Sequence, residues 1–277
     1  MESERNRFGV SRLCRALEVT RGGYYAWWNR WPSAHCMKDA ELLEQMHDHF
    51  KDNNGWYGSP RLHALLKRDG VRVSSKRVAR LMRQADLKAR AARIYRRMPG
   101  TTAFFAKIPN RLPQAVTGPN QVWVGDITYI KLAGRWRYLA TIMDKYSRRI
   151  VGWDLGLHRT AKLTISAFNG AIRNRRPPTG LVYHSDRGVE YGGYAFGDRL
   201  KQLGVVQSMN RPKSMNDNAH IESFFHSLKS EEVHGQVFET ETHLLHALSR
   251  YIRRYNSKRL HSSLGMRSPI DYERLAA

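Results

Sequence analysis

The stretch Val182-Tyr-His-Ser-Asp186-Arg-Gly-Val-Glu-Tyr191 opens the part of the chain that decides its fold, and Asp217-Asn-Ala-His-Ile-Glu222 closes it. An apolar run ends at Asp186, which is typical of a strand that opens into a loop. Glu222 lies four residues after Asn218 in a segment with helical spacing, so both side chains project from one face of the expected helix. Asp186 and Glu222 are therefore expected at the end of a strand and in the first turn of a helix, at positions that suit metal ligands.

A third acid, Asp126, lies within Val122-Trp-Val-Gly-Asp126-Ile-Thr-Tyr-Ile130. This run is rich in β-branched and aromatic residues and predicts a buried strand. An acid in such a strand is costly unless it is paired or bound to a metal ion. Each acid could also be an ordinary cap or surface charge.

If the fold brings the three acids together, their repulsion has to be offset. Two unit charges about 4 Å apart repel by roughly 4 kcal/mol at an effective dielectric constant of about 20. Magnesium and manganese ions prefer oxygen ligands and would relieve this repulsion. Two such ions, about 3.5–4 Å apart, can clamp the attacking and leaving oxygens of a phosphodiester.

Several further motifs surround the acids, and 35 residues lie between Asp186 and Glu222. The motifs are Trp123-x-x-Asp126-Ile-Thr-Tyr, Asp144-x-x-Ser147-Arg-x-Ile-Val-Gly-Trp153, His184-Ser-Asp-Arg-Gly-x-x-Tyr191, Asp217-Asn-Ala-x-x-Glu222-Ser-Phe and Tyr255-Asn-x-x-Arg-x-His-Ser-Ser-Leu264. In these motifs the chain resembles the OrfB-type transposases of bacterial insertion sequences. Its three acids are similar to the DDE triad of the retroviral-integrase catalytic core.

The resemblance implies a fold, an activity and partners. The fold is ribonuclease-H-like, with strand order 3-2-1-4-5. Asp126, Asp186 and Glu222 are then the catalytic residues and the ligands of Mg²⁺ or Mn²⁺, with two ions expected. The activity is DNA cleavage and strand transfer at the ends of an insertion sequence, that is, DNA transposition, integration and recombination. Expected partners are DNA, an OrfA protein as fusion or separate chain, and further copies of this chain on DNA.

The composition agrees with a nucleic-acid partner. The chain has 277 residues, 47 of them Lys or Arg against 24 Asp or Glu, which gives a net charge of +23. Such an excess predicts a polyanionic partner. Two cysteines are too few for a four-cysteine zinc site. No apolar run is long enough to span a membrane and no signal peptide is visible, so we expect a cytoplasmic protein without membrane contact. The resemblance implies a bacterial, nucleoid-associated protein.

The first third of the chain predicts helices. Two short ones are expected within residues 8–31, with Thr20 as a cap, and three within 39–90, with caps at Ser59 and at Ser74 or Ser75. The last is a short basic helix after a turn, the geometry of helix-turn-helix DNA readers. Its candidate DNA contacts are Lys76, Arg77, Arg80 and Arg83. A solvated basic face on a structural bundle is the alternative.

The remainder predicts an α/β core. Strands are expected over residues 121–130, 135–144 and 148–157 as an antiparallel meander, then two more before Asp186 and over 205–208. Helices are expected over 160–174, 191–203 and 240–256. These elements give a mixed five-stranded sheet with helices on both faces. The resulting division is 1–35 helical segment, 36–90 helix-turn-helix-like region, 91–118 basic linker and 119–277 catalytic core.

Other polar residues near the acids receive lesser roles. Asp144 is expected in a structural salt bridge, and Asp217 as the N-cap of the helix that carries Glu222. His184 either orients Asp186 or is a buried, hydrogen-bonded histidine. Further candidate DNA contacts are Arg187, Lys213, Asn218 and Lys229. Two rival functions stay open: a stand-alone ribonuclease-H-like nuclease and a non-catalytic DNA-binding regulator.

Overall fold

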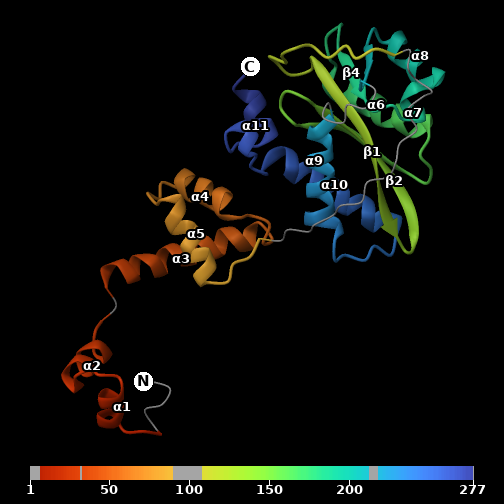
Figure 1. The fold of residues 1–277 in the computed structure, drawn as a ribbon. Coiled ribbons are helices and arrows are strands. Elements are labelled where there is room, and N and C mark those ends of the chain that lie inside the picture. Colours follow the sequence, from red (N-terminus) through yellow and green to blue (C-terminus); the bar gives the residue numbers. More distant parts are fainter. Residues whose placement is uncertain (1–6, 32, 90–107, 212–217, 277) are drawn as a thin grey trace. The chain divides into compact units, whose positions relative to one another are not determined.

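The computed structural model describes residues 7–31, 33–89, 108–211 and 218–276. They form two compact units, one within Met1–Lys88 and the other within Ala89–Ala277, which Figure 1 colours along the sequence. The finer division of the chain at residues 35, 90 and 118 stays a prediction. Most of the expected linker lies outside the described residues.

The N-terminal unit is helical. Its helices are α1 (Val10–Ala16), α2 (Arg21–Trp28), α3 (Ala34–Asp52), α4 (Ser59–Arg68) and α5 (Ser75–Gln84). Apolar residues at helical spacing in α3, α4 and α5 are buried and give the unit its small core: Leu42, Met46, Leu62, Leu65, Leu66, Val78, Leu81 and Met82. The pair α4 and α5, joined by a short turn, is the helix pair that the sequence predicted.

Hydrogen-bonding side chains mark where most of these helices begin. Thr20 and Ser74 each accept the backbone N–H three residues further on, at 3.0 and 3.2 Å, as predicted. The prediction that Ser59 caps α4 is wrong, because Gly58 is the N-cap and Ser59 is already helical. Pro60 fits anywhere in a first turn, where its missing N–H is not needed, so it did not fix the register.

The second unit is built on one five-stranded sheet of order β3-β2-β1-β4-β5. This order confirms the predicted ribonuclease-H-like arrangement. The first three strands are antiparallel, while β4 pairs in parallel with both β1 and β5. The strands are β1 (Val122–Leu132), β2 (Arg135–Asp144), β3 (Ile150–Gly156), β4 (Val182–Ser185) and β5 (Val206–Met209).

Helices cover both faces of the sheet (Figure 1). On one face, the buried side chain of Trp123 from β1 packs into a core with Phe168 of α6 (Ala161–Arg175) and Phe196 of α8 (Tyr194–Gln202). The other face carries α9 (Ala219–Leu228), which packs against β1, and α10 (Glu241–Ser257), which packs against β3. A π-helical segment, η3 (Lys229–Val233), continues α9, and a one-turn 3₁₀ helix, η4 (Ser262–Leu264), precedes α11 (Pro269–Arg274).

Two element boundaries differ from the sequence prediction. β1 runs on to Leu132, and the turn into β2 consists of Ala133 and Gly134, whose φ angles of 45° and 81° match the tight hairpin turn that suits twisted strands. The single helix expected over 191–203 is two, α7 (Val189–Gly192) and α8, because Gly193 between them has extended backbone angles.

Within the described residues, no helix combines the length and the apolar composition needed to cross a membrane. The longest, α3, has 19 residues and is interrupted by charges such as Lys38, Asp39 and Glu41.

Candidate active site

Strand register places two of the three predicted acids side by side. β1 and β4 pair in parallel as far as Gly125 and Ser185. The next residue in each case is an acid, Asp126 on β1 and Asp186 just after β4. Because β4 ends there, the β1 edge is open beyond Gly125 on that side of the sheet. The two carboxylates therefore share the point where the sheet opens.

The third acid comes from the first turn of α9. Glu222 projects from the exposed side of this helix. The opposite side is anchored by four buried side chains, Ile221, Phe224, Phe225 and Leu228. Since α9 packs against β1, this anchoring sets the position of Glu222 relative to Asp126.

The electrostatics of Asp126 show that the three carboxylates influence one another. Burial raises the pKa of Asp126 well above its usual range, and the charges of Asp186 and Glu222 raise it further. The backbone N–H of Ile127, which donates to Asp126 Oδ1 at 2.7 Å, and the guanidinium of Arg159 oppose this rise. The site thus holds more negative charge than its own donors neutralise.

Asp186 has neighbours that the sequence did not predict. Burial, and then the charge of Glu190, raise the pKa of Asp186, whereas the N–H of Gly188, at 3.0 Å from Oδ1, lowers it. Arg159 Nε donates to Glu190 Oε1 at 2.7 Å, and Arg159 Nη2 lies 3.9 Å from Asp186 Oδ2. Glu190 is itself buried, with 1% of its side chain exposed. Arg159 therefore ties a buried carboxylate to the predicted catalytic one.

A buried tyrosine lies directly behind the acids. Tyr183 of β4 packs among aromatic rings, including those of Tyr191 and Phe196. Burial raises the pKa of Tyr183, and the charges of Asp126 and Asp186 raise it too, so its phenol stays protonated. This ring passes so close to β1 that a Cβ added at Gly125 would lie 1.8 Å from Tyr183 Oη. Glycine is required at this position because of that close approach.

We expect Gly125→Ala to destabilise the protein by about 1–3 kcal/mol, because a methyl group would overpack the sheet against Tyr183. For a unit of this size, the midpoint of thermal unfolding should fall by roughly 2–12 °C, as circular dichroism can measure. Gly170→Ala is the matched control, since a Cβ at this helical position meets nothing within 4 Å. A Gly125→Ala variant as stable as the wild type would contradict this packing.

The donor chemistry fits a divalent metal ion, although the side chains do not form a complete cage. Within the ranges that the structure describes, no three His, Cys, Asp or Glu side chains are arranged to hold one ion. Magnesium does not require such a cage, because it commonly takes one or two carboxylates, several waters and substrate phosphates. The unneutralised charge around Asp126 is what a bound cation would offset.

His184 and Arg187 are engaged in the protein interior. His184 is fully buried and its two ring nitrogens lie 2.8 Å from Ser208 Oγ and 2.6 Å from Asn210 Oδ1. Arg187 Nε donates to the backbone carbonyl of Asn210 at 2.7 Å. Both residues join β4 to the segment after β5, so their contacts fix the loop of Asp186. DNA contact by Arg187 stays a prediction.

The candidate DNA contacts around α9 differ in their surroundings. Lys229 lies with its Nζ 4.4 Å from the ring centre of Tyr129, and its pKa is lowered by burial, against the opposing charge of Asp126. Asn218 is the N-cap of α9 and is 3% exposed. Lys213 and the expected cap Asp217 lie outside the described residues.

Two of the four basic residues predicted on α5 make intramolecular ion pairs. Arg77 and Arg80 each lie within 2.7 Å of the carboxylate of Asp39 on α3. These bonds, that of Arg80 foremost, lower the pKa of Asp39 despite its partial burial. Lys76 and Arg83 are exposed and are the two best placed to meet an external anion.

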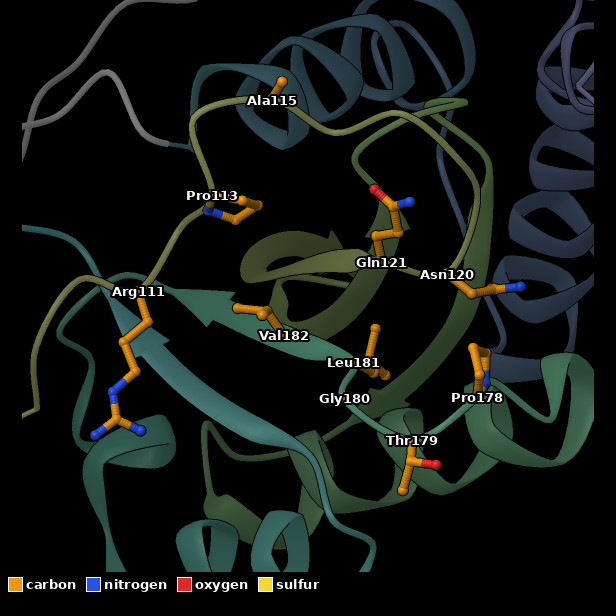
Figure 2. A pocket seen from close by; sticks show the side chains of 10 residues that line it. All are labelled: Arg111, Pro113, Ala115, Asn120, Gln121, Pro178, Thr179, Gly180, Leu181 and Val182. Atoms are coloured by element: carbon orange, nitrogen blue, oxygen red, sulfur yellow. The ribbon is translucent and has the colours of Figure 1, made fainter.

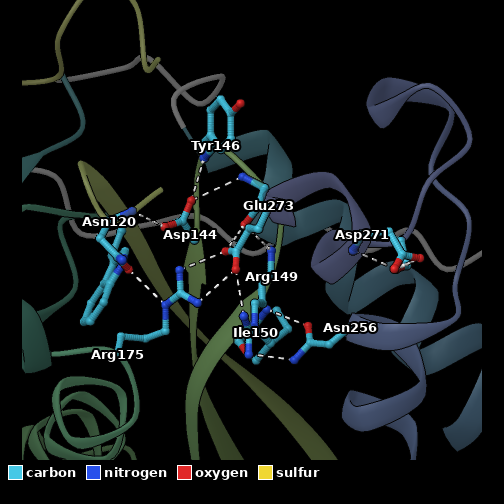
Figure 3. Close-up of polar contacts among 12 residues, drawn as sticks. Asn120, Asp144, Tyr146, Arg149, Ile150, Arg175, Asn256, Asp271 and Glu273 are labelled. Carbon is cyan, nitrogen blue, oxygen red and sulfur yellow. Dashed lines mark hydrogen bonds and ion pairs between the residues drawn. The ribbon is translucent and has the colours of Figure 1, made fainter. Parts of the chain in front are cut away.

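Asp144 has a structural role, but the prediction of a salt bridge is wrong, because backbone N–H groups bind its carboxylate instead. Its carboxylate accepts the backbone N–H groups of Asn120, Tyr146 and Ser147 at 2.6–3.2 Å, as Figure 3 shows. Beside it, Glu273 of α11 binds two arginines, Arg149 and Arg175, at 2.7–2.9 Å. This network attaches the C-terminal helix to the sheet.

A pocket of about 330 Å³ lies at the other end of β4 from Asp186. Figure 2 shows the side chains that line it, which come from the segment before β1 and from the loop that enters β4. Among the described residues, Arg111 is the only ionisable one that lines it, and Asp126, Asp186 and Glu222 are not part of its lining. The pocket is therefore distinct from the carboxylate site.

Comparison with known proteins places the chain among mobile-element proteins. Residues 38–95 match a family model described as an HTH-like domain, and residues 116–215 and 203–269 match two models described as integrase core domains. The chain is 37% identical to an insertion element IS600 uncharacterized 31 kDa protein of Shigella sonnei, with 94% of this chain and 97% of that protein covered. It is 34% identical to transposase InsF for insertion sequence IS3A of Escherichia coli strain K12, with 99% and 96% covered.

Among solved structures, the HTLV-2 integrase catalytic core domain in complex with magnesium is similar at a TM-score of 0.45 and 18% identity, covering 56% of this chain and 97% of that one. The sheet order and the matched family models define a transposase with an integrase core, preceded by an HTH-like region. The chain belongs to the IS3 family of insertion-sequence transposases, in its InsF or OrfB type. This membership confirms the resemblance found in its motifs.

Proposed function

We propose that the chain cleaves DNA at the ends of an insertion sequence and transfers the freed strand to a new phosphodiester, using Asp126, Asp186 and Glu222 as catalytic residues. The β1–β4 register carries this proposal, because it sets Asp126 and Asp186 next to each other at the opening of the sheet. The rise in the pKa of Asp126, to which burial and the charges of Asp186 and Glu222 contribute, supports it, since such a shift is expected where a cation is to bind.

The three carboxylates would hold two Mg²⁺ or Mn²⁺ ions, since a pair of ions can clamp the attacking and leaving oxygens of a phosphodiester. The chain's own residues have separate tasks. Arg159 fixes Asp186 through its bond to Glu190. Lys229, close to Asp126, is placed to meet a DNA phosphate. Function at two DNA ends further implies several copies of the chain on DNA and an OrfA protein as fusion or partner.

A strand-transfer assay tests the proposal. A labelled DNA end is incubated with the full chain and Mg²⁺ or Mn²⁺, with and without the upstream OrfA portion. Joined products that require the metal ion support the proposal. Cleavage without joining would favour a stand-alone nuclease, and DNA binding without any metal-dependent chemistry in either form would favour a non-catalytic regulator.

We expect Asp126→Asn to stabilise the metal-free protein at pH 7 by about 0.5–2 kcal/mol, the usual gain when a site strained for function is relaxed. The folded pKa of Asp126 is raised, so its carboxylate costs stability that is absent in acid and develops as pH rises from about 3.8 through the folded pKa. As pH rises through this range, the thermal midpoint of Asp126→Asn should increase relative to that of the wild type. Asp198→Asn is the control. Magnesium should raise the midpoints of the wild type and of Asp198→Asn but not that of Asp126→Asn.

Two results together would contradict the charge crowding inferred for this site. Asp126→Asn would be less stable than the wild type at pH 7, and magnesium would leave the thermal midpoint of the wild type unchanged.

For the N-terminal unit, we expect Lys76→Ala and Arg83→Ala each to weaken DNA binding and to reduce the slope of log affinity against log salt by about 1. Fluorescence anisotropy over a range of salt concentrations measures both quantities. Lys67→Ala, which removes an exposed charge from α4, is the control. If all three variants lost the same amount of DNA affinity, α5 would not be a preferred DNA-contact surface.

A further inference from the structure

The end of the β1–β2 hairpin carries two exposed aromatic rings that the proposed function does not use. Tyr129 is 45% exposed and Trp136 is 50% exposed. Their ring centres are 5.0 Å apart and the ring planes meet at 83°. In the hairpin register, Lys131 lies opposite Trp136, and Lys131 shares a face with Tyr129 because side chains alternate along a strand. The two rings thus form one aromatic surface.

A lysine stands over each ring. Lys229 Nζ lies 4.4 Å from the ring centre of Tyr129, and Lys131 Nζ lies 6.0 Å from that of Trp136. Lys229 also senses the charge of Asp126. Tyr129 also follows Asp126 by three residues on β1, so the aromatic surface adjoins the candidate active site along this strand.

The hairpin holds these rings in fixed positions. The N–H of Ala133 in its turn donates to the carbonyl of Phe238 at 3.2 Å. Arg137, next to Trp136, pairs with Glu241 of α10 at 3.0 Å. Aromatic side chains on a rigid element lose little entropy when they bind a flat partner.

The chemistry of this surface favours nucleic acid as its partner. A nucleobase stacks on an aromatic ring while the phosphates beside it meet lysines, and a protein of net charge +23 attracts such a polyanion. Bases inside a duplex expose only their edges, whereas an unpaired base presents its face. The ligand class is therefore a single-stranded or frayed DNA segment.

We propose that Trp136 stacks against an unpaired base of the DNA strand whose phosphodiester lies at Asp126, that Tyr129 meets the edge of this base, and that Lys131 and Lys229 contact the adjoining phosphates. This inference rests on the proposed function, because it takes the scissile DNA to lie at the carboxylates. It adds a preference for DNA ends that are opened next to the cleavage point.

The test compares two DNA ends of the same sequence, one fully paired and one with a short unpaired tail that carries 2-aminopurine. Affinity and fluorescence quenching are measured without divalent metal for the full-length wild type, Trp136→Ala, Trp136→Phe and Tyr194→Ala. Tyr194 is the control, since it is an aromatic side chain that is 93% exposed on α8. Thermal unfolding of each variant excludes misfolding.

We expect Trp136→Ala to bind the tailed DNA about 5- to 100-fold more weakly and to lose quenching, as base–aromatic stacking predicts. Trp136→Phe should keep most of both, Tyr194→Ala should match the wild type, and binding of paired DNA should change little. Wild-type affinity of Trp136→Ala for the tailed DNA would overturn the proposal. The proposal would also be overturned if Trp136→Ala lost self-association in light scattering while its DNA binding stayed intact. The surface would then be a protein interface.

Because these measurements involve no chemistry, they are separate from the strand-transfer assay. A wild type that joins strands while Trp136→Ala binds tailed DNA normally would refute the stacking surface alone. A wild type that quenches 2-aminopurine through Trp136 yet performs no metal-dependent joining would refute the proposed function and leave a single-strand binding surface.

Discussion

Glu222→Gln should reduce metal-dependent DNA cleavage and joining by at least about 10³-fold, since the loss of several kcal/mol of charge stabilisation at a metal site corresponds to such a factor. Glutamine has the same shape but no charge, so the variant isolates the carboxylate. The measurement is the initial rate of product formation from a labelled DNA end in Mg²⁺ and in Mn²⁺.

The structure predicts that this variant stays folded. Glu222 lies on the exposed side of α9, and the helix is held by buried residues on its other side. The thermal midpoint and the affinity for DNA without metal should therefore stay close to those of the wild type. Glu239→Gln, an exposed acid outside the site, controls for a general effect of removing one negative charge.

The outcome separates three interpretations of the site. A loss of both cleavage and joining places Glu222 in the chemistry. Full activity of Glu222→Gln would show that its carboxylate is an ordinary charge of a helix first turn, where acids are common because they complement the helix dipole. A loss of DNA binding in parallel with activity would mean that the residue acts through the DNA contact.

The parts of the fold that follow from periodic patterns were predictable from the sequence. The strand around Asp126 is rich in β-branched and aromatic residues, and an apolar run precedes Asp186, so both strands were predictable. Resemblance to a known family then supplied the strand order. The proximity of Asp126 and Asp186, which depends on the pairing of their strands, was therefore foreseeable from that resemblance.

The residues that hold the acids in place were not predictable in the same way. Arg159 stands 27 residues before Asp186 in a loop without a distinctive pattern, and only the packing of α6 brings it to Glu190. The sequence hardly indicates that Glu190 is buried beside Asp186, because it lies only four residues further on in a polar segment. Asp144 is expected in a salt bridge from the sequence, but the tight turn beside it offers backbone N–H groups that no sequence pattern displays.

The second large effect concerns stability. We expect Arg259→Met to destabilise the protein by about 3–5 kcal/mol, because it leaves the buried carboxylate of Glu231 without its cation. The two side chains are 8% and 6% exposed, and Arg259 Nη2 lies 2.6 Å from Glu231 Oε1. Tyr251 donates a further hydrogen bond to Glu231 at 3.0 Å. The thermal midpoint should fall by roughly 6–20 °C.

A double variant distinguishes a stranded charge from lost packing. Arg259→Met combined with Glu231→Gln removes the charge and keeps an acceptor for Tyr251, so it should recover at least about half of the loss if desolvation of the unpaired carboxylate dominates. Arg274→Met is the control, since its ion pair with Asp271 is exposed and such pairs contribute about 0–1 kcal/mol. A loss no larger than that of the control would contradict the buried pair.

This ion pair also bears on the candidate active site. Glu231 belongs to η3, which continues directly from α9, the helix that carries Glu222. Arg259 follows α10 in the chain and binds Glu231 of η3. The ion pair between them therefore fixes the C-terminal end of the segment formed by α9 and η3. We expect the loss of this pair to loosen that end and to place Lys229 and Glu222 less accurately. At a temperature where Arg259→Met is folded, this variant should therefore join DNA strands more slowly than the wild type. Arg274→Met should join them at the wild-type rate.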